Sequence, residues 1–150
     1  MQYHNDVPVF VLDTDVIVAG LRSSRGASRQ LLHAALDGQF DLLLSVPLIL
    51  EYEAVLRRRE QLEACGLDER QVERVLDDLA AVARPVKFAF RWRPKLRDPN
   101  DDMVLETAMN GGADAIVTFN ARDFQLADLD QICAVIMPRE ALQKLRRQNS

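Results

Sequence analysis

Short apolar runs alternate along this chain with longer segments in which apolar residues recur every three or four positions. The short runs are rich in β-branched residues, as are strands covered on both faces of a parallel sheet, and the longer segments have the period of amphipathic helices. We predict strands at residues 9–12, 40–44, 85–89, 113–118 and 132–136, of which 85–89 has the weakest pattern. We predict helices at residues 15–21, 28–35, 47–62, 68–83, 99–110 and 138–147. Because strand and helix alternate throughout, the predicted fold class is α/β, with a parallel sheet flanked by helices.

Capping residues indicate where some of these helices begin and end, and the sequence as a whole predicts a single domain. Asp68, with Gln71 three residues later, forms a capping box at the start of one helix. Two glycines at 111–112 end another. No repeat, low-complexity segment or linker divides the sequence, so we expect one domain over residues 1–150, with a core at about 9–138 followed by a C-terminal helix at about 138–147.

The composition fits a globular domain without a general attraction to polyanions. The chain has 150 residues, 48% of them hydrophobic, and a net charge of −4. Chains of this length bury about 68–70% of the surface that they expose when unfolded, which is enough for a core. Since the overall charge is negative, a polyanionic substrate would need local basic patches or bridging cations.

The N-terminus and the cysteines indicate a reducing compartment. The first residues, MQYHNDVP, lack the basic and apolar regions of a signal peptide. No apolar run approaches the ~18 residues that a membrane span needs. Cys65 and Cys133 match neither a CxxC pair nor a disulfide framework, and we predict that both are reduced core residues. We therefore expect a cytoplasmic protein with no membrane association.

Polar side chains follow the two most strongly apolar strands. Asp13 comes directly after the first strand, with Asp15 two positions later. Asn120 and Asp123 follow the strand that ends at Thr118. Because ligands of parallel sheets bind beyond the carboxyl ends of the strands, we expect these groups to share one edge. A purely local alternative is that Asn120 caps its own turn.

Helical geometry points a further carboxylate at the core. In the helix at 99–110, Asp101 falls almost on the centre line of the apolar face, whose members are Val104, Leu105, Ala108 and Met109. Its place in the first turn is where the helix macrodipole favours negative charge. The alternative is a helix cap in contact with solvent.

Three other carboxylates are placed less sharply. Glu51 and Glu53 lie on opposite flanks of the buried stripe of their helix, so either could reach the crevice and either could be ordinary surface charge. Asp98 fits a turn or a cap, or a group that supports the site from behind.

Several carboxylates in one crevice repel one another unless protons or cations neutralise them. An all-oxygen set of ligands favours Mg²⁺ or Mn²⁺ over Zn²⁺. Neither His4 nor His33 has a neighbour in the sequence that would position it as a general base. The pattern therefore indicates a site for hard divalent cations.

A basic segment is a candidate for binding nucleic acid. Residues 87–97, KFAFRWRPKLR, interleave aromatic and basic side chains, as a groove that stacks bases and contacts phosphates would. The candidate RNA-binding residues are Arg91, Trp92, Arg93, Lys95 and Arg97. The alternative that we prefer is a strand with core aromatics followed by a solvated loop. The basic clusters at 57–59 and 144–147 fit solvated helix faces, or contacts with an oligomer or a partner.

Four segments in this order resemble the PIN-domain family, and more closely its branch of toxins from bacterial toxin–antitoxin pairs. They are VFVLDTDVIVAGL, PLILEYEAVL, RDPNDDMVLETA and ADAIVTFNARDF, and the likeness runs from Val9 to about Pro138. The resemblance implies a five-stranded parallel sheet flanked by helices. It also implies metal-dependent cleavage of single-stranded RNA, a small antitoxin partner and frequent homodimers.

The resemblance also assigns roles to particular residues. It implies one or two Mg²⁺ or Mn²⁺ ions, with Asp13, Glu51 and Asp101 as metal-site and catalytic residues, Glu51 rather than Glu53 matching the family's glutamate. The family's last acid falls in the segment from Asn120 to Asp123. The catalytic residues then expected are Asp13, Glu51, Asp101 and Asp123, with Asp15, Asp98, Thr118 and Asn120 in support.

Two positions depart from the pattern of this branch. Position 15, often Asn, is Asp here, and position 120, often Asp, is Asn. The fourth acidic role then passes to Asp123, or Asp15 compensates for Asn120.

Two other functions compete with the nuclease. LDTDVI is similar to the opening motif of haloacid-dehalogenase-type phosphatases, but the acidic motif RDPNDD precedes the strand AIVT, where that family needs it to follow. The other alternative is a module on the PIN fold that binds RNA or protein without catalysis.

Overall fold

The computed structural model describes residues 7–89, 99–125 and 129–148. Within them the chain forms a five-stranded sheet in the order β3-β2-β1-β4-β5, in which all neighbouring strands are parallel. The strands are β1 (Val9–Leu12), β2 (Asp41–Leu44), β3 (Arg84–Pro85), β4 (Ala115–Val117) and β5 (Ala134–Ile136). The predicted α/β class and the five-stranded parallel sheet are confirmed.

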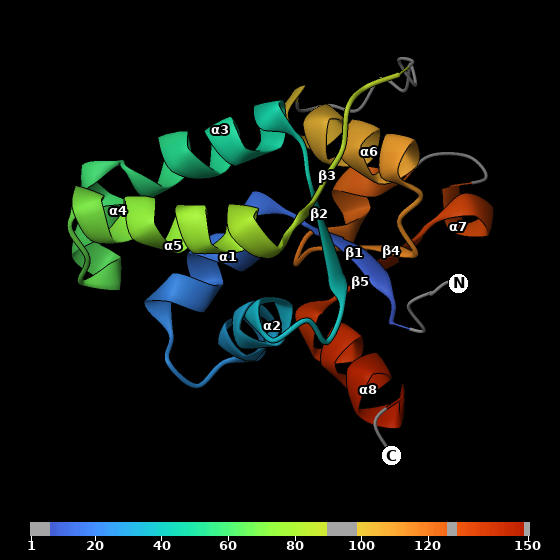
Figure 1. Ribbon diagram of the computed structural model, residues 1–150, viewed down its shortest axis with the longest axis horizontal. Coiled ribbons are helices and arrows are strands. Elements are labelled where there is room, and N and C mark those ends of the chain that lie inside the picture. The colour runs from blue at the N-terminus through green and yellow to red at the C-terminus, as the bar shows by residue number, and fades with distance from the viewer. Residues whose placement is uncertain (1–6, 90–98, 126–128, 149–150) are drawn as a thin grey trace.

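Helices cover both faces of the sheet. They are α1 (Thr14–Arg22), α2 (Ala27–Leu36), α3 (Val46–Leu56), α4 (Arg59–Cys65), α5 (Glu69–Val82), α6 (Pro99–Gly111), α7 (Leu129–Ile132) and α8 (Pro138–Gln148), with a 3₁₀ turn η1 (Ala121–Phe124). Helices α2 and α8 pack together below the strands in Figure 1, and α3 and α6 pack together above them. Among the described residues, no helix has the length and apolar character needed to cross a bilayer.

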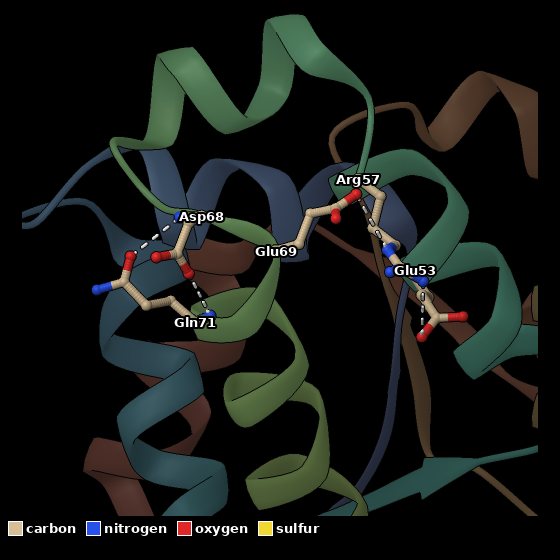
Figure 2. A network of polar contacts seen from close by, with 5 residues as sticks. All are labelled: Glu53, Arg57, Asp68, Glu69 and Gln71. Carbon is tan, nitrogen blue, oxygen red and sulfur yellow. Dashed lines mark hydrogen bonds and ion pairs between the residues drawn. The ribbon is translucent and has the colours of Figure 1, made fainter.

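The buried residues follow the predicted patterns. Phe10, Val11 and Leu12 of β1 are fully buried, as the continuous apolar run predicts for a central strand. The capping box of Asp68 and Gln71 is present at the start of α5 (Figure 2). Both cysteines are free thiols, Cys133 buried and Cys65 partly buried.

The helix predicted at 47–62 is wrong as one continuous element. It is two helices, because Arg58 leaves the helical conformation (φ −63°, ψ 139°) and becomes the N-cap of α4. The backbone N–H of Arg57, the C-cap of α3, donates to the carbonyl of Glu53 at 3.0 Å, and that of Arg58 donates to the carbonyl of Val55 at 3.2 Å, which closes α3. Helical periodicity does not detect such a break, because the apolar pattern continues through it.

The strands predicted at 85–89 and 132–136 are too long. Strand β3 ends at Pro85, and proline has no N–H to donate to a ladder. Beyond it, the backbone N–H of Ala89 donates to the side chain of Asn110 rather than to a neighbouring strand. At the other edge of the sheet, α7 takes up residues to Ile132 before β5 begins at Ala134.

Candidate active site

A cavity of about 650 Å³ lies where β1 and β4 end. It is bounded by residues of α1, α3, α4, α6 and η1. Six of the predicted site residues line it: Asp13, Asp15, Glu51, Asp101, Asn120 and Asp123. The carboxyl ends of two neighbouring parallel strands thus open into one pocket, as the rule for ligand sites in such sheets predicts.

Asp13 lines this cavity and is held by hydrogen bonds with α1 and β4 and with the residue that follows β4. It is 8% exposed and forms the N-cap of α1, where its Oδ1 accepts a hydrogen bond of 2.8 Å from the backbone N–H of Thr14. Its Oδ2 accepts a hydrogen bond of 2.7 Å from the hydroxyl of Thr118, which is fully buried. Its backbone N–H donates to the carbonyl of Val117 on β4. Both strand ends therefore fix the orientation of this carboxylate.

Asp15 and Asn120, the two positions at which the sequence departs from the toxin branch that it resembles, are in direct contact. The side-chain amide of Asn120 donates a hydrogen bond of 2.9 Å to Oδ2 of Asp15. The same oxygen accepts from the backbone N–H of Phe119 at 3.2 Å and from the hydroxyl of Thr118 at 3.4 Å. The carboxylate of Asp15 and the amide of Asn120 thus form a hydrogen-bonded pair just beyond the carboxyl ends of β1 and β4.

Negatively charged carboxylates lie close together in the cavity and shift the pKa values of neighbouring groups. Burial, together with the nearby carboxylate of Asp13, raises the pKa of Asp15 to about 6, although the three hydrogen bonds to Asp15 act in the opposite direction. Burial and the charges of Asp13 and Asp15 raise the pKa of the Tyr52 hydroxyl above its ordinary value. That hydroxyl donates to the backbone carbonyl of Leu12, directly before Asp13.

A polar link between helices places Glu51 and Asp101. Glu51 lies on α3 and is half-buried, and Asp101 lies in the first turn of α6 and is 9% exposed. Ser45, the N-cap of α3, is 2.7 Å from the hydroxyl of Thr107 on α6, and both side chains are buried. Because Thr107 donates its own proton to the carbonyl of Met103, Ser45 is the donor in this contact. The link holds the two acid-bearing helices together.

The remaining predicted residues have different surroundings. Glu53 does not line the cavity and forms an ion pair with Arg57 on the surface of α3. Thr118 lies behind the site and orients Asp13. His33 is exposed on α2. His4, Asp98 and the candidate RNA-binding residues Arg91, Trp92, Arg93, Lys95 and Arg97 lie outside the described residues.

The chemistry of the site fits a hard cation. Among the described residues, the side-chain oxygens that are buried without a hydrogen-bond partner are Asp15 Oδ1, Ser28 Oγ and Gln61 Oε1, and two of these belong to residues that line the cavity. Buried polar atoms of this kind normally have a binding partner. A divalent cation would bind Oδ1 of Asp15 and offset the repulsion between Asp13 and Asp15. In the described part of the chain, no three acidic, His or Cys side chains are already drawn together as a metal site.

The cavity also has residues that sequence analysis did not assign to it. Arg22, Arg58 and Gln61 line the wall formed by the end of α1 and the start of α4. In the sequence, Arg58 is only one of three consecutive basic residues. Its place in the cavity depends on the break between α3 and α4, for which the apolar pattern contains no signal.

Comparison with known proteins shows the fold and the family. No curated protein matches the chain significantly. The crystal structure of VapBC2 from Rickettsia felis bound to a DNA fragment from their promoter contains a chain of similar fold, with a TM-score of 0.54 and 14% identity over 86% of this chain and 96% of that chain. The family model of the PIN domain matches residues 9–122. This chain therefore belongs to the PIN domain family.

Proposed function

We propose that this protein is an endoribonuclease that hydrolyses phosphodiester bonds of single-stranded RNA with the help of Mg²⁺ or Mn²⁺. The observation that carries the proposal is the convergence of Asp13, Glu51 and Asp101 on one cavity from the end of β1, from α3 and from the first turn of α6. These residues are far apart in the sequence. The strand pattern points to Asp13 and the helical wheel points to Asp101, whereas Glu51 is preferred to Glu53 only by the resemblance to the PIN-domain family. Membership of the PIN domain family supports a nuclease over a phosphatase of the haloacid-dehalogenase type.

The side chains have the properties that this hydrolysis requires. A bound divalent ion makes the attacking water more acidic and stabilises the charge on the leaving oxygen. Asp13 and Asp101 would hold the ion, because both are nearly buried and Asp13 is oriented by two hydrogen bonds. Glu51, half-buried in the cavity wall, would hold and orient the attacking water.

We assign the fourth acidic role to Asp15. Its Oδ1 is buried without a partner, and its other oxygen is paired with the amide of Asn120. The toxin branch that the sequence resembles often has Asn at position 15 and Asp at position 120. This chain has Asp at 15 and Asn at 120, so the carboxylate and the amide are exchanged between the two positions. Asp123 is exposed at the rim of the cavity, a place that suits a second, weaker ion.

The cellular role that we propose is that of the toxin in a toxin–antitoxin pair. Under this proposal the protein acts in the cytoplasm, forms a homodimer and is inhibited by a small antitoxin protein. The sequence resemblance to the toxin branch supports this role, and so does the similarity of fold to a chain of the VapBC2 structure.

One observation favours the alternative of a non-catalytic binding module. In the part of the chain that the structure describes, no group of three potential ligands is prearranged for a metal ion. That alternative predicts that Mn²⁺ does not stabilise the fold, and that Asp13→Asn and Asp101→Asn raise the melting temperature equally with and without Mn²⁺.

Cleavage of single-stranded RNA tests the proposed function. We expect the wild-type protein to cut a mixed pool of RNA in the presence of Mn²⁺ and to stop on addition of EDTA. We expect Asp13→Asn and Asp101→Asn, purified in the same way, to lose most of this activity. Equal activity in all three preparations would show a contaminating nuclease and would overturn the proposal.

A further inference from the structure

The lining of the cavity carries charges of both signs. Besides the carboxylates described above, it includes two arginines, Arg22 and Arg58. Arg22 lies in the last turn of α1 and Arg58 lies between α3 and α4, and both side chains are exposed. Helix α1, which packs against α4, thus provides Arg22, and the interruption between α3 and α4 provides Arg58.

Arg58 differs from the two arginines beside it. Arg57 forms ion pairs with Glu53 at 3.8 Å and with Glu69 at 3.6 Å, as Figure 2 shows. Arg59 pairs with Glu63 at 3.7 Å on the open surface. For Arg58, no ion pair is found with any residue that the structure describes, and of the three it is the one that lines the cavity.

The break between the helices is what gives Arg58 this position. Its extended backbone interrupts the helical path, and its carbonyl accepts from the backbone N–H groups of Gln61 and Leu62 at 3.0 Å each. In a continuous helix, three consecutive arginines would point in directions about 100° apart around one axis. Here the break turns Arg58 to the cavity, while Arg57 and Arg59 pair with glutamates outside it.

Arg22 has a second reason to lie where it does. A cation in the last turn of a helix stabilises the negative end of the macrodipole. That effect requires only that Arg22 be near the end of α1, and it does not explain why an arginine from another element lines the same cavity. The coincidence of Arg22 and Arg58 is the feature that needs a ligand.

From this geometry we propose that Arg22 and Arg58 hold a backbone phosphate of single-stranded RNA beside the carboxylates. The chain has a net charge of −4 and its cavity is acidic, so a polyanion needs a local cation to enter. The planar guanidinium group donates two parallel hydrogen bonds to a phosphate, which a lysine does not do. Substrate held by the arginines would place a neighbouring phosphodiester at the carboxylates.

This inference rests on the proposed function for the identity of the substrate, but its test does not depend on cleavage. Binding of a fluorescein-labelled oligouridylate of 12 nucleotides is measured by fluorescence anisotropy in EDTA, over a series of KCl concentrations. The variants are Arg58→Gln, Arg22→Gln and Arg58→Lys, with Arg59→Gln as the matched control, because Arg59 adjoins Arg58 and lies outside the cavity. Thermal melting of each variant verifies that it is folded.

We expect Arg58→Gln and Arg22→Gln each to weaken binding at least fivefold at low salt. Each should also reduce the slope of log K against log[KCl] by about 0.7, the value for one phosphate contact on a single strand. Arg58→Lys should keep the slope and lose part of the affinity, since the charge stays and the paired hydrogen bonds do not. Arg59→Gln should bind as the wild type does.

Several results would overturn the proposal. Equal losses in Arg58→Gln and Arg59→Gln would show only a general effect of charge, and absence of binding by the wild type would remove the phosphate contact altogether. If Arg58→Gln instead weakened binding of a glutamate-rich dodecapeptide and left the oligonucleotide unaffected, the arginines would serve an acidic protein partner. Failure of the nuclease proposal has a different signature, namely the expected arginine effects on binding with no cleavage in Mn²⁺.

Discussion

Asp15 offers the most quantitative test of the idea that crowded carboxylates destabilise this protein until a cation binds. Its carboxylate is half-buried, one of its oxygens has no hydrogen-bond partner, and Asp13 lies close enough to raise its pKa. Replacing it with Asn removes the charge and keeps the shape of the side chain. We expect Asp15→Asn to stabilise the metal-free protein.

The magnitude follows from the pKa of the group. A rise from 3.8 to about 6 corresponds, at 1.36 kcal/mol per pKa unit, to at most about 3 kcal/mol of destabilisation at pH 8, where Asp15 is ionised in both folded and unfolded chains. Solvent screens a half-buried group, so we expect about 1–2 kcal/mol. For a chain of 150 residues this is a rise in melting temperature of about 2–8 °C.

The assay is thermal unfolding at pH 8 with EDTA and with Mn²⁺, with Asp77→Asn on the exposed side of α5 as the control. Mn²⁺ at a concentration 100 times its Kd should stabilise the wild type by about 2.7 kcal/mol, and Asp15→Asn by much less. The control should resemble the wild type in both conditions. A lower melting temperature for Asp15→Asn in EDTA, or an equal gain from Mn²⁺ in both proteins, would refute the reasoning.

Three further predictions concern the same site and its scaffold. Asp15→Asn and Asn120→Asp should each lower the RNA cleavage rate at least tenfold. The double variant should recover most of the rate, because it restores the carboxylate–amide pair, and a double variant as slow as the single ones would contradict this. Tyr52→Phe should cost about 1–3 kcal/mol in urea unfolding, because it removes the donor to the buried carbonyl of Leu12, and an unchanged midpoint would show that this hydrogen bond contributes nothing. Gly111→Ala should cost about 1–3 kcal/mol, since the new Cβ would lie 2.5 Å from Cδ1 of Leu43 and 2.8 Å from Cγ2 of Val86, whereas stabilisation would mean that both side chains move aside freely.

Sequence patterns predicted the parts of this molecule in which burial and periodicity coincide. The continuous apolar run of β1 placed Asp13 at the carboxyl end of a central strand, and the helical wheel of residues 99–110 turned Asp101 inward. Both deductions use only the repeat of the element and the position of the polar residue in it. For the same reason the choice between Glu51 and Glu53 stayed open, because two residues on opposite flanks of a stripe are equivalent in a wheel.

Contacts between distant residues were beyond the reach of such patterns. The hydrogen bonds from Thr118 to Asp13 and from Asn120 to Asp15 span more than 100 positions, and no local rule pairs these residues. The break at Arg58 was missed because it results from capping hydrogen bonds at two helix ends and not from the apolar pattern. The place of Arg58 in the cavity, which depends on that break, could be found only in three dimensions.

The central claim is that carboxylates from separate elements combine to bind a divalent cation. Calorimetric titration of Mn²⁺ into the wild type and into Asp101→Asn tests it most directly, because Asp101 reaches the cavity from α6, far along the chain from Asp13 and Glu51. The claim predicts saturable binding by the wild type that weakens at least tenfold in Asp101→Asn. Equal affinity in the two proteins, or no binding by either, would contradict it.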